Sequence, residues 1–247
     1  MIMKKVLIVL MITGCVFSNV FAQEYKELKN AGVLAFQEKK YDDALKSYTQ
    51  SLDLVKQELT ANSADEELNN QEKDLLYKIA LCHYQKGTTS KAAADYKACL
   101  TFIDQAIAKE YYSGGNAFVY KANSHKQLKE QANMVAALKA GYEKAPDNKN
   151  LKKLLSQEYL KAGLDSYNKG VEQQKKANAA TDAAKQKVEL EKANVEFTKS
   201  LPFFENAYLL DSSETVLKAL QNVYKSLAKV EATELEKLKT QKVNLGI

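Results

Sequence analysis

The sequence predicts an all-α protein built as a solenoid of paired helices, because one residue pattern occurs twice. The pattern combines small residues, where two helices must touch, with aromatic residues, where they must interlock. Its first copy comprises Gly32, Phe36, Ala44, Tyr48 and Leu52. The second copy, 48 residues later, comprises Ala80, Tyr84, Ala92, Tyr96 and Leu100. The chain also has only two prolines, and long helices with few breakers fit that composition.

Residues 1–22 have the pattern of a bacterial secretory signal, so we do not expect them to be part of the fold. Lys4 and Lys5 precede a mostly apolar stretch, and the small residue Ala22 stands just before Gln23. The apolar stretch is short for a membrane span. The sequence therefore predicts an exported protein, with cleavage after Ala22.

A second interpretation of the same segment stays open. The stretch from Ile12 to Cys15 resembles a lipobox, in which Cys15 would be lipidated and become the new N-terminus. The apolar Val16 and Phe17 fit a continuing signal core better, which favours cleavage after Ala22. The expected location is the periplasm or the outer membrane, and a membrane is an expected partner only if Cys15 is lipidated.

The charge composition argues against a nucleic-acid partner. All 36 basic residues are lysine, and the net charge of +5 falls to +3 once Lys4 and Lys5 are removed with the signal. Nucleic-acid sites rely on the bidentate arginine fork, and this chain has neither arginine nor a dense basic block.

Two cysteines, Cys82 and Cys99, remain after cleavage of the signal. In an exported protein they could be oxidised to a disulfide. The favoured interpretation is that both are small buried residues of the core.

Hydrophobic periodicity and turn residues place the first three pairs of helices. We expect them over residues 25–37 and 44–59, 75–85 and 90–106, and 117–128 and 132–144. The expected turns and loops are 39–43, the polar stretch 60–67, and Lys86-Gly87. Gly114-Gly115 breaks the chain before the third pair, and Pro146 ends that pair because proline cannot continue a helix.

The fourth unit is predicted to be unusually long. One helix over 154–179 passes through two glycines, and a connector over 180–187, which could itself be helical, leads into a helix over 188–210. Pro202 is expected near the start of a helix or at a kink. The residues from Asp211 to Glu214 predict an N-cap for a helix over 215–227. A charged final helix over 231–242 suits a solubilising cap.

Three segments resemble the tetratricopeptide repeat (TPR), with its small residue, aromatic, turn, alanine, aromatic and small-Leu elements. They read NAGVLAFQEKKYDDALKSYTQSL, ALCHYQKGTTSKAAADYKACL and, as a weaker match, ANSHKQLKEQANMVAALKAGYEKAPDN. Met134 and Leu138 stand where the family has alanine and an aromatic, and Phe36 and Tyr84 come one position late. The segment SLPFFENAYLLD resembles the second helix of a further repeat.

The resemblance implies a TPR helical-hairpin solenoid over residues 23–247, with an elongated fourth repeat and C-terminal capping helices. The expected units are repeats over 24–57, 73–106 and 115–148, the elongated unit over 151–212, and the cap over 213–242. This layout is similar to that of exported TPR proteins of the Bacteroidetes.

The resemblance also implies a binding surface on the concave face, which the first helices of TPR arrays line. Among the positions that line this face in the family, we select nine as candidate partner-binding residues: Lys29, Phe36, Gln37, Tyr77, Tyr84, Gln85, Asn123, Lys126 and Gln127. The other positions on this face are Val33, Asp74, Leu81, Asn116 and Val119. A row of glutamines could pair with an extended peptide backbone, or be helix formers at exposed positions. The aromatics could anchor a peptide or pack against neighbours.

One use of the fold is excluded by sequence. Some TPR domains clamp a C-terminal carboxylate with a Lys-Asn-Asn-Lys-Arg set on successive first helices. At the matching positions this chain has Lys29, Val33, Lys78, Asn116 and Tyr120, and only the first agrees. A clamp of that type is therefore not expected.

No constellation of catalytic or metal-binding residues is present in the sequence. His83 and His125 occupy the same repeat position and face the partner helix, which packing explains. Cys82 and His83 cannot make a zinc site alone, and zinc-protease, serine-hydrolase and phosphate-loop motifs are absent. We expect no cofactor, no metal and no enzymatic activity.

The leading hypothesis is a non-catalytic protein–protein interaction scaffold of the bacterial cell envelope. Its partner is another protein or peptide, whose identity the sequence does not give. The first alternative is a lipoprotein subunit of an outer-membrane assembly or secretion machine. The second is a glycan-binding accessory protein, which the absence of tryptophan disfavours.

Overall fold

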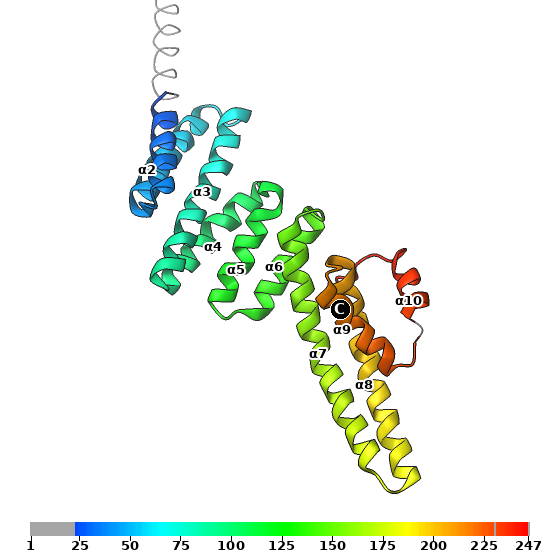
Figure 1. Cartoon of the computed structure of the whole chain (residues 1–247). Coiled ribbons are helices and arrows are strands. Elements are labelled where there is room, and N and C mark those ends of the chain that lie inside the picture. The colour runs from blue at the N-terminus through cyan, green and yellow to red at the C-terminus, as the bar shows by residue number, and fades with distance from the viewer. Residues whose placement is uncertain (1–22, 230, 247) are drawn as a thin grey trace, which may run out of the picture. The chain divides into compact units, whose positions relative to one another are not determined.

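The computed structural model describes residues 23–229 and 231–246 (Figure 1). The predicted signal, including Cys15 and the cleavage site at Ala22, lies outside these residues. The chain divides into two compact units, one ending at Ala137 and the other beginning at Leu138. Each unit is therefore described by itself.

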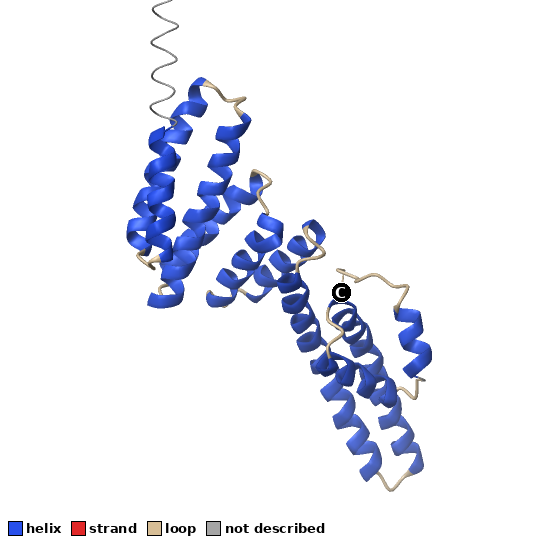
Figure 2. Cartoon of the chain, turned by 45° about the horizontal axis from the view of Figure 1, so that its top comes forward, coloured by secondary structure: helices blue, strands red, loops and turns tan. Residues whose placement is uncertain are grey.

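Both units are built from helices and short connections, as Figure 2 shows. Residues 23–229 and 231–246 contain no strand, which confirms the predicted all-α class. None of the helices in these ranges combines the length and apolarity that a membrane crossing requires.

The first unit is a series of antiparallel helix pairs. A helix over residues 23–37 pairs with α2 (Tyr41–Ala61). The next pair is α3 (Glu66–Ser90) with α4 (Ala93–Ala108). A short 3-10 turn, η1 (Ser113–Gly115), leads into α5 (Asn116–Gln127). The final helix, α6 (Gln131–Lys144), crosses the boundary between the units.

Local chemistry fixes where these helices begin and end. The Asp65 carboxylate accepts a hydrogen bond of 2.9 Å from the Leu68 backbone N–H and so caps α3. Lys91 ends α3 in the left-handed conformation, at φ 59°. Gly114 and Gly115 both have positive φ, which explains why this break in the chain requires glycine.

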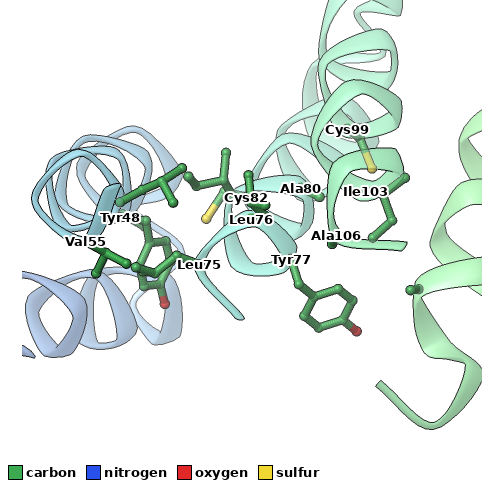
Figure 3. Close-up of a cluster of buried hydrophobic side chains, with 14 of the residues drawn as sticks. Tyr48, Val55, Leu75, Leu76, Tyr77, Ala80, Cys82, Cys99, Ile103 and Ala106 are labelled. Atoms are coloured by element: carbon green, nitrogen blue, oxygen red, sulfur yellow. The ribbon is translucent and has the colours of Figure 1, made fainter. Parts of the chain in front are cut away.

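The core of the first unit is centred on α3, which carries buried side chains on two sides. In Figure 3, Leu75 lies beside Tyr48 and Val55 of α2. On the other side, Ala80 lies near Ile103 of α4. Because α3 contacts both α2 and α4, neither helix pair can bury its apolar face without the other.

The second unit is dominated by one long hairpin. α7 (Lys149–Ala179) runs antiparallel to α8 (Ala183–Leu210), and α9 (Glu214–Ser226) packs on the hairpin. α10 (Glu231–Leu238) follows. The side chains of Asn148 and Asp182 cap α7 and α8 by accepting hydrogen bonds of 3.0 and 2.8 Å from backbone N–H groups.

The second helix pair differs from the prediction at its turn. Lys86 and Gly87 were expected in a turn, but both lie inside α3, which continues to Ser90 and begins nine residues before Leu75. In the last turns of α3, hydroxyl groups add hydrogen bonds to main-chain carbonyls: Thr88 donates to Gln85 O at 2.7 Å, and Ser90 donates to Lys86 O at 2.9 Å. The predicted register for this pair was therefore wrong.

Other boundaries differ from the prediction by smaller amounts. The expected loop over 60–67 is shorter, because α2 ends at Ala61 and α3 begins at Glu66. The turn expected over 39–43 is also shorter, because Asp42 and Asp43 lie in the first turn of α2. Their negative charges stabilise the start of the helix by interacting favourably with the helix dipole.

The elongated fourth unit is confirmed as a helix pair, with corrections to its connections. α7 begins at Lys149 rather than at 154, and the expected connector over 180–187 is helical from Ala183 onward. Pro202 lies inside α8, so the first of its two expected placements, near the start of a helix, was wrong. The N-cap of α9 is Ser213, which lies within the expected stretch from Asp211 to Glu214. The final helix ends at Leu238 rather than at 242.

The two small residues that the sequence placed at helix contacts have different environments. Ala44 is fully buried in α2. Ala92 is half-buried and precedes α4 as its N-cap, outside both helices of the pair.

Ala44→Trp should therefore lower the free energy of unfolding by about 1–3 kcal/mol or more through overpacking. Ala92→Trp should cost clearly less, and urea unfolding of both variants makes the comparison. An equal loss in both variants would contradict this assignment.

Candidate partner-binding face

Four of the positions predicted for the concave face, Val33, Phe36, Gln37 and Leu81, border a hollow between the helix over 23–37 and α3. The hollow has a volume of about 310 Å³. Its walls are formed by Val33, Phe36, Gln37, Tyr48, Lys78 and Leu81. The structure thus brings Phe36 and Gln37 of the first repeat together with Leu81 of the second. We call the exposed surface of these first helices, together with that of α5, the first-helix face.

Phe36 contributes an aromatic ring to the lining of the hollow. Its ring is half-buried and meets the Tyr41 ring edge-to-face at 5.5 Å between centroids, which fixes its orientation. Gln37, the next residue, is exposed at the rim. The hollow therefore offers an apolar surface with an amide group beside it.

A charged network lies one to two helical turns before the residues of the hollow. Lys29 Nζ is 2.6 Å from Asp74 Oδ2 and also donates a hydrogen bond to Gln71. The Tyr111 hydroxyl donates to Asp74 Oδ1 at 3.0 Å, and Lys78 Nζ approaches that oxygen at 3.6 Å. Lys29 thus has a structural partner in Asp74, and Lys78 borders the hollow with only a loose ion pair.

The two tyrosines predicted as anchors lie in an aromatic cluster. Tyr77 is only 8% exposed, and its ring packs against Tyr111 at 5.4 Å and Tyr120 at 6.3 Å. Tyr84 is half-buried and packs edge-to-face against Tyr120 at 5.0 Å. Burial raises the pKa of both phenols, so both rings stay neutral at physiological pH. Tyr77 therefore has little exposed surface, whereas Tyr84 is partly exposed.

The remaining candidates are spread along the first-helix face. Gln85 is half-buried near the end of α3. On α5, Asn123 is half-buried, and Lys126 and Gln127 are exposed. None of these four residues borders the hollow, so the structure does not gather the three glutamines into one site.

The sequence predicted Asp74 as a concave position and Lys78 only as a position of the excluded clamp, but it did not predict their interactions. Asp74 joins Lys29 to Tyr111, and Lys78 supplies the positive charge at the hollow. The four-residue spacing of Asp74 and Lys78 in α3 is the sequence signal of a helical ion pair.

Both histidines are held by neighbouring side chains. His83 stacks on Phe102 with centroids 5.7 Å apart, and burial lowers the pKa of its imidazole. His125 Nδ1 lies 2.7 Å from Glu130 Oε2. Within residues 23–229 and 231–246, no group of three or more His, Cys, Asp or Glu side chains is arranged to hold a metal ion.

Comparison with known proteins supports the fold. No family model matches the sequence, and no curated protein matches it. Among solved structures, the chain is similar to a TPR repeats protein from Bacteroides fragilis, known from a crystal structure. The two share 23% identity with a TM-score of 0.53, and the alignment covers 81% of this chain and 98% of that one. The chain thus has an all-α helical-repeat fold of the TPR type.

Cys82 and Cys99 are free thiols in the core of the first unit, as the sequence favoured. Both side chains are fully buried (Figure 3). Burial raises the pKa of the Cys82 thiol to about 12 and that of Cys99 to about 11. A rise of one in pKa lowers the thiolate fraction about tenfold, and the thiolate is the reactive form.

We therefore expect both cysteines to resist iodoacetamide at pH 8 while the protein is folded. Mass spectrometry of peptides carrying Cys82 and Cys99 should show no modification until urea unfolds the chain, after which both should react fully. Rapid alkylation of either thiol in the folded protein would contradict the buried environment described above.

Proposed function

We propose that this protein is a non-catalytic interaction scaffold of the bacterial cell envelope, and that it binds an extended partner segment at the first-helix face. The observation that supports the proposal most strongly is the hollow between the helix over 23–37 and α3. Its apolar walls from Phe36 and Leu81, beside the polar Gln37 and Lys78, suit one large apolar side chain of a bound segment. The polar groups at the rim can then hydrogen-bond to the segment's main chain.

The chemistry of the described residues favours binding over catalysis. The histidines and Asp74 interact with structural neighbours. A hollow lined by aliphatic, aromatic, amide and ammonium groups can recognise a side chain but offers no nucleophile paired with a base. Helical-repeat folds of the TPR type generally mediate protein–protein interaction.

The envelope location in this proposal rests on the sequence of residues 1–22. Cleavage after Ala22 gives a periplasmic protein, whereas lipidation at Cys15 gives an outer-membrane lipoprotein. Incorporation of labelled palmitate, lost in a Cys15→Ser variant, would establish the lipoprotein form. Absence of label, together with a mature N-terminus at Gln23, would establish the periplasmic form.

A cross-linking experiment identifies the partner at this face. A photo-reactive amino acid placed at Gln37, on the rim of the hollow, should capture the partner in growing cells. The same residue placed at Lys46, which is exposed on α2 away from the hollow, is the matched control. Captured proteins common to both positions are not bound at the hollow.

Once the partner is identified, substitutions of two apolar residues in one helix distinguish binding at the hollow from nonspecific binding to exposed apolar side chains. Phe36 borders the hollow, whereas Leu34 is 62% exposed and does not. Phe36→Ala should weaken binding by about 2 kcal/mol, roughly thirtyfold in Kd, because it removes an aromatic contact. Leu34→Ala should bind as the wild type does. Calorimetric titration checks both variants, and equal affinities for wild type and Phe36→Ala would contradict the proposed site.

A further inference from the structure

The segment over residues 241–246 follows α10 without regular secondary structure up to Asn244 and ends in a turn at residues 245 and 246. The Asn244 side chain closes this turn, because its Oδ1 accepts a hydrogen bond of 2.9 Å from Gly246 N–H. Val243 and Leu245 are half-buried, whereas Asn244 and Gly246 are exposed. The segment therefore lies against the second unit with its two aliphatic side chains turned away from solvent.

Asn206 of α8 forms two hydrogen bonds with the main chain of this segment. Its side-chain nitrogen donates to Asn244 O at 3.1 Å, and its side-chain oxygen accepts from Asn244 N at 2.8 Å. An amide side chain thereby makes the same pair of hydrogen bonds that a neighbouring β-strand would make. Both bonds are made by main-chain atoms of Asn244, whose side chain accepts instead from Gly246 N–H.

Two further side chains bind the same stretch of main chain. The Tyr159 hydroxyl of α7 donates to Asn244 O at 3.0 Å, and Lys139 of α6 donates to Leu245 O. The Lys139 ammonium group also lies 5.9 Å from the Tyr159 ring centroid. We call Lys139, Tyr159 and Asn206 the main-chain cradle; all three belong to the unit that begins at Leu138.

The two uncharged members of the cradle are buried when the segment is in place. Asn206 and Tyr159 are each 3% exposed, and buried polar groups are costly unless they are hydrogen-bonded. The segment supplies their partners, and the main chain of a second peptide could supply the same ones. The side chains that join the segment to α10, those of Lys239, Thr240, Gln241 and Lys242, are all exposed. Release of the segment therefore uncovers the cradle without exposing side chains of this connection, and it requires less free energy than unfolding of the unit.

We propose that the main-chain cradle is a peptide-binding site, and that the 241–246 segment occupies it in competition with a segment of a partner protein. The hydrogen bonds select the main-chain N–H and C=O groups of one residue. The half-buried positions of Val243 and Leu245 select aliphatic side chains two residues apart. This site is separate from the hollow of the first unit, so either proposal can fail without the other.

The test uses the full chain with the segment released by substitution. Val243→Asp combined with Leu245→Asp places charge at the two half-buried positions and should free the cradle. Gln241→Asp combined with Lys242→Asp introduces two aspartates at exposed neighbouring positions and is the matched control. The probe is a fluorescent peptide, Gln-Lys-Val-Asn-Leu-Gly, capped at both ends, and its binding is measured by anisotropy.

The released variant should bind the probe at least about tenfold more tightly than the wild type or the control variant, because its cradle is empty. N-methylation of the probe's asparagine removes one main-chain donor and should weaken binding by about fivefold or more. In the released background, Tyr159→Phe removes one hydroxyl group and should weaken binding severalfold. This substitution keeps the ring and so preserves the packing.

Three results would overturn the proposal. One is a released variant that keeps its helical circular-dichroism spectrum but binds the probe no better than the wild type. Another is an N-methylated probe that binds as tightly as the parent peptide. The third is a wild-type dimer that the release substitutions dissociate, because the occupant of the cradle would then come from a second copy of the chain.

Discussion

Contact between a glycine in one helix and an aromatic ring in its partner is the constraint on which both units depend. It occurs at Gly32 with Tyr48, Gly87 with Tyr96, Gly163 with Phe204, and Gly170 with Phe197. A Cβ atom added at these glycines would lie 2.5, 2.9, 2.7 and 2.7 Å from the respective ring, closer than side-chain carbons approach. Each missing side chain therefore creates the space in which a ring is buried, and each contact fixes the register of one hairpin.

This constraint also positions the two candidate binding sites. In the first unit, Gly32 places the helix over 23–37 on α2, so that Phe36, one turn later, reaches the hollow. In the second unit, Tyr159 lies one turn before Gly163, and Asn206 lies two residues after Phe204. The same contact that joins α7 to α8 thus brings together the hydroxyl and the amide that hold residue 244.

The sequence predicted the helices well because local periodicity and breakers determine them. Gly114 and Pro146 end segments where expected, and Met134 and Leu138 are buried despite departing from the repeat pattern. The register of the second pair was mispredicted because Ala80 was aligned with Gly32. In the structure Gly87, taken for a turn residue, makes the close contact with the Tyr96 ring.

The sites were less predictable because they depend on contacts between distant residues. Alignment to the repeat placed Phe36, Gln37 and Leu81, which do meet at one hollow. It gave no sign that Tyr77 is packed among other tyrosines, since Tyr111 lies outside the repeat pattern. The cradle joins residues that are 38 and 85 positions apart in the sequence, and no local motif marks it.

A double-mutant cycle at Gly170 and Phe197 tests the central claim most directly. Gly170→Val should lower the free energy of unfolding by about 1–3 kcal/mol, because the new side chain meets the Phe197 ring. Phe197→Ala should lower it by about 3–5 kcal/mol through the cavity it leaves. The double variant should lose at least about 1 kcal/mol less than the sum, since valine fills part of that cavity. Losses that add to within about 0.3 kcal/mol would contradict the claim that glycine and ring share one space.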